Sequence, residues 1–121
     1  MCIRDRAEEL DSIILLKGRL TRVTAPGQPL YSFNAGHSFA ATPGSGDVLS
    51  GILGAVMAQL FASAPAASPA GVIAEVLHAG AIHAHAAAIA AETPEGFAPC
   101  SASQIAAAIP RAIARLLNAE R

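Results

Sequence analysis

The sequence predicts an α/β fold, and three features indicate it. Residues 12–16 (SIILL) form a short, continuous apolar run, typical of a strand buried on both faces of a parallel sheet. Residues 21–24 and 30–33 alternate in polarity around Pro26-Gly27, which predicts a β-hairpin. After residue 47 the apolar stretches are long and rich in alanine, and they have the length of helices.

The N-terminal residues 1–6 (MCIRDR) fit no pattern that follows, and we interpret them as a non-native leader. Residues 7–121 would then form the domain. A parallel strand at 12–16 needs neighbouring strands, which would have to come from sequence upstream. We therefore expect the chain to be truncated at its N-terminus.

Lys17 follows the first strand directly, at the end where ligands bind in open α/β sheets. The alternative is a lysine that only marks the solvent edge of the sheet. Residues 34–43 form a loop that leads from the hairpin into a glycine-rich turn.

Two long helices are predicted after this turn. The first spans 47–62 and is nearly all apolar or small, so we expect it to be buried on most sides. A linker at 63–70, rich in Ala, Ser and Pro, separates it from a second helix at 69–91.

A last helix begins after a Pro/Gly turn region at 93–99. Ser101 and Gln104 have capping-box spacing, and isoleucines repeat along one face of the helix that follows. Pro110 lies inside this pattern and is expected to kink or restart the helix.

Three histidines on the second helix raise the question of a metal site. His78 and His85 share a face but lie two turns apart, about 10 Å along the axis, and His83 points elsewhere. Zinc needs ligand atoms about 2 Å from the ion. We expect histidines that are packed or hydrogen-bonded, and no metal ligands.

Composition disfavours nucleic acid as a partner, because the net charge is -1 and the aromatic residues number only one Tyr, four Phe and no Trp. Cys2 and Cys100 are unclustered, which indicates a reducing, cytoplasmic setting. The charged N-terminus does not resemble a secretory signal.

A membrane span is considered because residues 48–74 carry no charge. Pro65 and Pro69 divide this run, and it lacks flanking basic residues and the interfacial Trp or Tyr of membrane helices. We therefore expect no membrane partner.

Asp47 is the single charged residue among the 52 residues between Arg22 and Glu75. It follows Gly44-Ser45-Gly46, and a glycine turn that opens a helix directs free backbone N–H groups and the helix dipole at one point. The pattern predicts a phosphate site with a carboxylate beside it. An ordinary loop that ends in an Asp near a helix cap is the alternative.

Four segments resemble the family of ADP/ATP-dependent NAD(P)H-hydrate dehydratases, whose domain has the ribokinase-like fold. Residues 15–21 (LLKGRLT) are similar to the family's L-K-G-x-x-T segment, and residues 36–51 to its G-N-P-x-x-A-T-x-G-[ST]-G-D-V-L-[AS]-G stretch. Residues 82–87 resemble L-H-G-x-A-G, and residues 101–110 resemble T-A-S-D-L…L-P. The resemblance implies the C-terminal part of a three-layer α/β/α domain.

The sequence departs from the family pattern at four positions. His37 stands in place of Asn, Pro43 in place of Ala, Ala84 in place of Gly, and Gln104 in place of Asp. Asp47 is retained.

The resemblance implies repair of hydrated NADH or NADPH (NADHX or NADPHX), in which ADP or ATP with Mg²⁺ converts the hydroxyl into a phosphate that leaves. Asp47 would be the catalytic residue and would contact substrate together with Gly36 and His37. The implied adenine-nucleotide site comprises Lys17, Gly18, Arg19, Leu20, Thr21, Gly44, Ser45 and Gly46.

Two other functions stay open at this point. One is a ribokinase-like small-molecule kinase, which would yield a stable phosphorylated product. The other is a non-catalytic fragment, and we expect the chain by itself to lack turnover. The sequence does not determine the oligomeric state, and a homo-oligomer is one of the alternatives.

Overall fold

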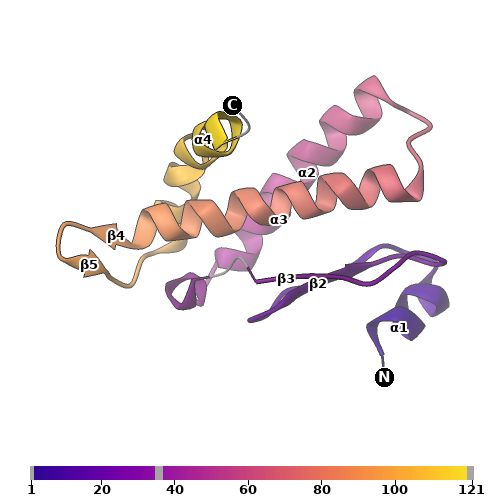
Figure 1. Ribbon diagram of the computed structural model, residues 1–121, viewed down its shortest axis with the longest axis horizontal. Coiled ribbons are helices and arrows are strands. Elements are labelled where there is room, and N and C mark those ends of the chain that lie inside the picture. The colour runs from indigo at the N-terminus through magenta and orange to yellow at the C-terminus, as the bar shows by residue number, and fades with distance from the viewer. Residues whose placement is uncertain (1, 35–36, 120–121) are drawn as a thin grey trace.

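The computed structural model describes residues 2–34 and 37–119 (Figure 1). A short helix and three strands come first, and three long helices follow, with a small hairpin before the last of them. The bounds are α1 Ile3–Leu10, β1 Ile14–Leu16, β2 Thr21–Thr24, β3 Tyr31–Phe33, a 3₁₀ turn Ser38–Ala40, α2 Ser45–Ser63, α3 Pro69–Ala91, β4 Glu92–Thr93, β5 Gly96–Phe97 and α4 Ala102–Ala119. The mixed α/β class is confirmed.

The predicted hairpin is present. Strands β2 and β3 pair antiparallel, with Thr21 opposite Phe33 and Val23 opposite Tyr31. The connecting turn is closed by the N–H of Gln28, which donates to the carbonyl of Ala25 at 3.0 Å. Gly27 has a φ of 68°, as the third position of a type II turn requires.

The expectation of a parallel strand at 12–16 is wrong. β1 lies at the edge of a three-stranded antiparallel sheet of order β1-β2-β3, and Leu16 is exposed. A short apolar run indicates burial without indicating which strand will pair with it. Here the next strand in the chain pairs with β1, because a short connection brings it alongside.

The sheet has a helix on each side. α3 packs over one face, where Val23 and Ala25 meet Val72, Ile73 and Val76 in a buried cluster. α1 lies against the other face, as Figure 1 shows. The described residues thus form three layers in the order α1, sheet, α3, with α2 and α4 packed on α3.

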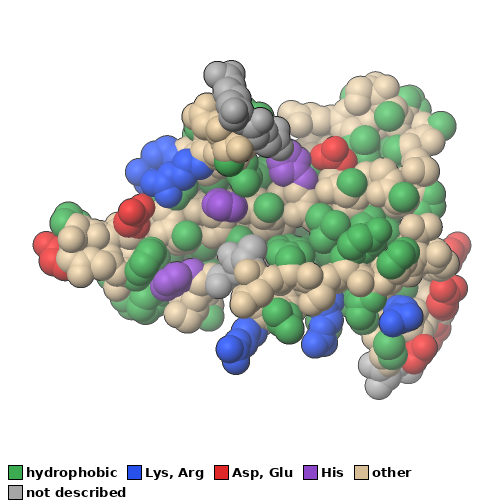
Figure 2. Space-filling view, in the orientation of Figure 1, with side chains coloured by type: hydrophobic (Ala, Val, Ile, Leu, Met, Phe, Trp, Pro, Cys, Tyr) green, Lys and Arg blue, Asp and Glu red, His purple; other side chains and the backbone are tan. Residues whose placement is uncertain are grey.

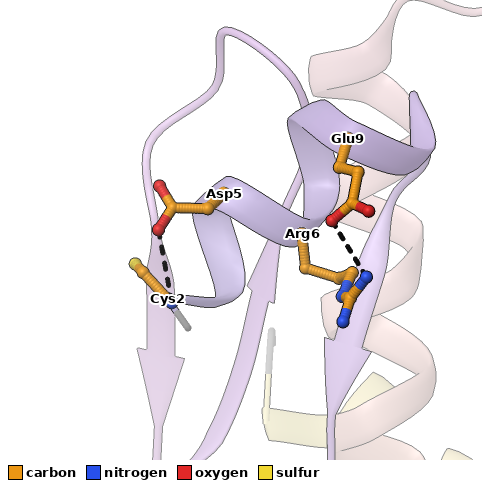
Figure 3. A network of polar contacts seen from close by, with 4 residues as sticks. All are labelled: Cys2, Asp5, Arg6 and Glu9. Atoms are coloured by element: carbon orange, nitrogen blue, oxygen red, sulfur yellow. Dashed lines mark hydrogen bonds and ion pairs between the residues drawn. The ribbon is translucent and has the colours of Figure 1, made fainter.

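α1 begins within the segment that we interpret as a leader. Its first turn is closed by the backbone N–H of Cys2, which donates to Asp5 Oδ2 at 3.3 Å, and Arg6 Nη1 pairs with Glu9 Oε2 at 2.9 Å (Figure 3). The boundary at residue 6 therefore falls inside one continuous helix. A foreign origin for residues 1–6 stays a prediction.

α3 is the central helix of the molecule. Ser68 caps its N-terminus by accepting from the N–H of Gly71 at 3.1 Å, and Pro69 occupies the first helical position. A second buried cluster, which includes Ile89 and the fully buried Ile105, joins its C-terminal half to α4.

α2 is less buried than expected. By length and composition alone, both α2 and α3 are apolar enough to cross a membrane, but the most apolar stretch of α3 is 61% buried inside the molecule and that of α2 only 17%. Only Ser45, Leu49 and Ile52 of α2 are buried. The expectation failed because, among the described residues, neighbours cover mainly the N-terminal half of α2.

The region 93–99 contains a small hairpin, β4–β5, in place of a plain turn. The predicted capping box of α4 is present: Gln104 N–H donates to Ser101 Oγ at 3.2 Å, and Ser101 N–H donates to Gln104 Oε1 at 2.8 Å. α4 continues through Pro110 without restarting.

Candidate functional site

The glycine turn before α2 adopts a backbone conformation that favours glycine. Gly44 precedes the helix with a φ of 87°, and a Cβ built there would lie 3.0 Å from Cβ of Ala102. A side chain at this position would be strained by its backbone and pressed against α4. Gly44 is therefore required by the fold.

Gly46 differs from Gly44, because its φ is not positive and a Cβ there would meet no described atom within 4 Å. Nothing in the described part of the fold requires glycine at this position. A glycine in the first turn of a helix also weakens that helix slightly. The absence of a side chain at Gly46 leaves space for a ligand to approach the backbone.

The first turn of α2 offers open hydrogen-bond donors. The N–H of Ser45 donates to Thr42 and that of Val48 donates to Gly44, both at 3.1 Å. Among the described residues, no hydrogen-bond acceptor is bound by the N–H groups of Gly46 and Asp47. These two donors, with the positive end of the helix dipole, favour an anion here.

Ser45 joins three elements of the fold at this turn. Lys17, after β1, donates from Nζ to Ser45 Oγ at 3.0 Å. His83 of α3 places Nε2 3.1 Å from Ser45 Oγ and 3.0 Å from the Ser45 carbonyl oxygen. Ser45 is 1% exposed and His83 is 6% exposed. The predicted nucleotide segment and the glycine turn are thereby held together.

The environment of His83 favours the neutral imidazole. Burial, followed by the nearby Lys17 ammonium, lowers the pKa of His83 from its ordinary value of 6.5. The hydrogen bond to the Ser45 carbonyl opposes this shift in part. An uncharged His83 can therefore lie beside the Lys17 cation without added repulsion.

A cavity of about 760 Å³ opens between the hairpin, the 3₁₀ turn, α2 and α3. Its apolar wall includes Phe33, Leu49 and Ala84, and its polar side carries five of the residues predicted to bind nucleotide or substrate. These five are Lys17, Gly18, Arg19, Thr21 and His37. The cavity is large enough for a small-molecule ligand.

His37 is held at this cavity by aromatic neighbours. Its ring stacks on Phe39 with the centroids 5.0 Å apart, and lies 4.5 Å from the ring of Phe97 in the β4–β5 hairpin. The N–H of Phe39 donates to His37 Nδ1 at 3.3 Å. The ring is thus fixed where an Asn side chain was expected from the family pattern.

The other predicted site residues lie beside this cavity or away from it. Asp47 is exposed in the first turn of α2, and with Gly44, Ser45 and Gly46 it belongs to the turn next to the cavity without lining it. Leu20 is exposed and does not line the cavity. Gly36 lies outside the described residues.

Basic side chains project from the sheet on the side away from α3, as Figure 2 shows. Metal-ligating groups are not gathered in the same way: in the part of the chain that the structure describes, no three His, Cys, Asp or Glu side chains come close enough to hold an ion. His78 instead lies 3.7 Å from Glu75 on the exposed surface of α3.

A second cavity, of about 590 Å³, lies between α2, α3 and α4 and contains none of the predicted site residues. Its lining is mostly aliphatic and includes Val56, Ile82 and Ile113. It has no charged group beyond Glu75 and, when protonated, His78. This composition does not suit a phosphate.

His83 is the residue of the site that the sequence did not single out. We expected its side chain to be packed or bonded, which is confirmed, but its partner Ser45 is 38 residues away in the chain. The available signal was a histidine in residues 79–91, a stretch of α3 that apart from His85 contains only Ala, Ile and Gly, since a buried histidine needs a hydrogen-bond partner.

Comparison with known proteins gives a consistent result. The family model described as NAD(P)H-hydrate dehydratase matches residues 1–110. The chain is 46% identical, over 91% of its length, to the bifunctional NAD(P)H-hydrate repair enzyme Nnr of Corynebacterium glutamicum. It is 44% identical, over 93% of its length, to the enzyme of the same name from Mycobacterium leprae.

A shorter match, 46% identical over 38% of the chain, links it to the ADP-dependent (S)-NAD(P)H-hydrate dehydratase of Neisseria meningitidis serogroup B and covers 16% of that protein. The chain spans 21% of the C. glutamicum enzyme and 22% of the M. leprae enzyme. No solved structure matches the chain significantly. The family match over residues 1–110 shows that the chain belongs to the NAD(P)H-hydrate dehydratase family.

Proposed function

We propose that this chain carries the nucleotide-facing part of an ADP- or ATP-dependent dehydratase that returns NADHX and NADPHX to NADH and NADPH. The observation that carries the proposal is the 3.0 Å hydrogen bond from Lys17 Nζ to Ser45 Oγ. It joins the segment that resembles the family's nucleotide-binding stretch to a helix N-terminus with open N–H donors. The relatives named as hydrate repair enzymes supply the substrate.

The adenine nucleotide would lie along Lys17–Thr21 with its phosphates at the glycine turn. The N–H groups of Gly46 and Asp47 and the Lys17 ammonium would bind phosphate oxygens. These donors are fixed before the ligand arrives, so little reorganisation accompanies phosphoryl transfer. Gly46 supports this role, because the described fold does not itself need a glycine there.

Asp47 would act as the general base. Its carboxylate would accept the proton of the substrate hydroxyl while that oxygen forms a bond to the terminal phosphoryl group of the nucleotide. The bond between this phosphorus and the rest of the nucleotide breaks. The carbon–oxygen bond of the new phosphate ester would then break to release inorganic phosphate, while the adjacent ring carbon loses a proton to water and the ring double bond is restored. His37 and Gly36 would contact the substrate.

Mg²⁺ is part of the proposal as a counter-ion of the nucleotide. The described residues contain no cluster that would bind the ion alone, which fits an ion held mainly by phosphate oxygens and water. When bound, it would neutralise charge on the phosphates. The chain's own donors would still set the position of those phosphates.

We place the reaction in the cytoplasm, without nucleic acid or membrane as partner. The unpaired cysteines and the net charge of -1 support this placement.

The test exchanges the matched segment of the C. glutamicum enzyme for this chain and follows the absorbance of NADH recovered from its hydrate with ADP or ATP. Asp47→Asn is expected to lower the rate on the order of 10²–10⁴-fold, since it removes the proton acceptor. Asp11→Asn, the same change at an exposed carboxylate after α1, is the control and should leave the rate unchanged.

Retention of the full rate by Asp47→Asn would exclude the proposed mechanism. Transfer of labelled phosphate to a stable product, without recovery of NADH, would instead support the kinase alternative. ADP binding by the unexchanged chain is measured in parallel, because its absence would favour a non-catalytic fragment.

A further inference from the structure

Three polar side chains are buried among the described residues: Thr24, Ser45 and His83. Thr24 is satisfied within its own hairpin, where its hydroxyl lies 3.4 Å from the Pro29 carbonyl. Ser45 and His83 come from different helices and bond each other. Burial of such a pair is costly unless the hydrogen bonds are well formed, so the contact is specific.

The donors and acceptors at Ser45 determine how the protons are arranged. The Lys17 ammonium can only donate, so Ser45 Oγ accepts from it. The Ser45 carbonyl can only accept, so His83 carries its proton on Nε2 and donates to this oxygen at 3.0 Å. The same N–H also reaches Oγ at 3.1 Å.

This arrangement limits the freedom of Lys17. A lysine side chain in water samples many rotamers, and ordering it costs conformational entropy. Ser45 Oγ is a fixed acceptor because His83, on the largely buried helix α3, holds the residue through a second hydrogen bond. The Lys17 ammonium is thereby kept at the cavity, near the first turn of α2.

We infer that His83 is a positioning residue of the proposed nucleotide site, which holds Ser45 so that its hydroxyl oxygen fixes the Lys17 ammonium where a phosphate would bind. The inference rests on the proposed function for the identity of the ligand. It adds a residue of α3 that would contribute to nucleotide affinity through Ser45 and Lys17.

The experiment compares two amide substitutions in the full 121-residue chain. The amide nitrogen of Gln lies near the place of Nε2, whereas that of Asn lies near Nδ1. His83→Gln should therefore keep the donor to the Ser45 carbonyl, and His83→Asn should lose it. The exposed His85, two residues along the same helix, provides the control His85→Asn.

ADP affinity is measured by calorimetry at a temperature where every variant is folded. We expect His83→Asn to weaken ADP binding by about 10-fold, which is the order of one hydrogen bond. His83→Gln should stay within about 3-fold of the unmodified chain, and His85→Asn should equal it. Ser45→Ala combined with His83→Asn should be no weaker than Ser45→Ala alone, because both act through one contact.

Nitrogen NMR of the unmodified chain gives a readout that needs no ligand. We expect the neutral Nε2–H tautomer of His83 at pH 7, and Lys17 ammonium protons that exchange slowly with water in the unmodified chain and quickly in His83→Asn. A different tautomer of His83 would overturn the inference. So would equal ADP affinity together with equal Lys17 proton exchange in His83→Asn and His83→Gln. Absence of ADP binding with the expected NMR result would contradict the proposed function alone.

Discussion

The two cavities on either side of α3 differ in how their walls are held. The cavity beside the hairpin is lined by Lys17 and His83, which both bond to the buried Ser45 and so join three elements distant in sequence. The cavity between α2, α3 and α4 is lined by aliphatic side chains from helices that follow one another in the chain. Directional polar contacts fix atoms to within a few tenths of an ångström, whereas apolar packing fixes mainly volume.

This difference suits the first cavity to a charged ligand of defined geometry. Apolar substitutions should act mainly on stability, whereas substitutions at the polar contacts should also act on ligand binding. Substitutions in the two regions should therefore have different consequences, and the predictions below are ordered by their expected size.

The largest effect is expected at Ile105, which is fully buried between α3 and α4. Ile105→Ala should lower the free energy of unfolding by about 2–5 kcal/mol, because it removes buried methyl groups and leaves a cavity. Ile113, in the same helix but 39% exposed at the apolar cavity, is the control. Ile113→Ala should cost less than about 1 kcal/mol in urea unfolding, and equal losses would show that α4 packs differently.

Alanine substitutions at the two glycines before and within the first turn of α2 should change the free energy of unfolding in opposite directions. Gly44→Ala should destabilise the chain by about 1–3 kcal/mol, because the residue has a positive φ and its Cβ would press on Ala102. Gly46→Ala should stabilise it by up to about 1 kcal/mol through helix propensity, yet weaken ADP binding by obstructing the approach of phosphate. Thermal unfolding and calorimetry with ADP measure the two effects, and unimpaired binding by Gly46→Ala would remove Gly46 from the site.

The sequence was sufficient wherever a feature depends on residues close together in the chain. The type II turn at Pro26-Gly27, the capping box of Ser101 and Gln104, and the three long helices were all predicted, because each follows from local backbone chemistry.

Features that depend on distant partners were missed. We predicted that the strand at 12–16 would be parallel to its neighbours, but β1 pairs antiparallel with β2. The prediction failed because apolarity does not specify which strand will be the neighbour. The sequence did not predict the hydrogen bond between Ser45 and His83, because tertiary packing sets how α2 crosses α3. The site residues named from the sequence stay a prediction, and the mutual orientation of Lys17, Ser45 and His83 could not be predicted at all.

Part of the pH dependence of stability should come from His83 at the polar cavity. The pKa of His83 is lowered in the folded chain, so the unfolded chain binds more protons between that pKa and 6.5. Stability should therefore fall as the pH drops below about 7, by at most about 1.4 kcal/mol per pH unit from this group. His83→Gln should remove this part of the slope in urea titrations at several pH values, and an unchanged slope would place the lowered pKa elsewhere.

The smallest effect is expected at the exposed pair Arg115 and Glu92, which joins α4 to the start of β4 at 3.4 Å. Both side chains are more than half exposed, so water and salt screen the attraction and the side chains lose rotamer freedom in forming it. Arg115→Ala should change the free energy of unfolding by less than about 0.5 kcal/mol. A loss above about 1 kcal/mol that disappears in high salt would show that this surface contact, like the buried one at Ser45, orders the elements it joins.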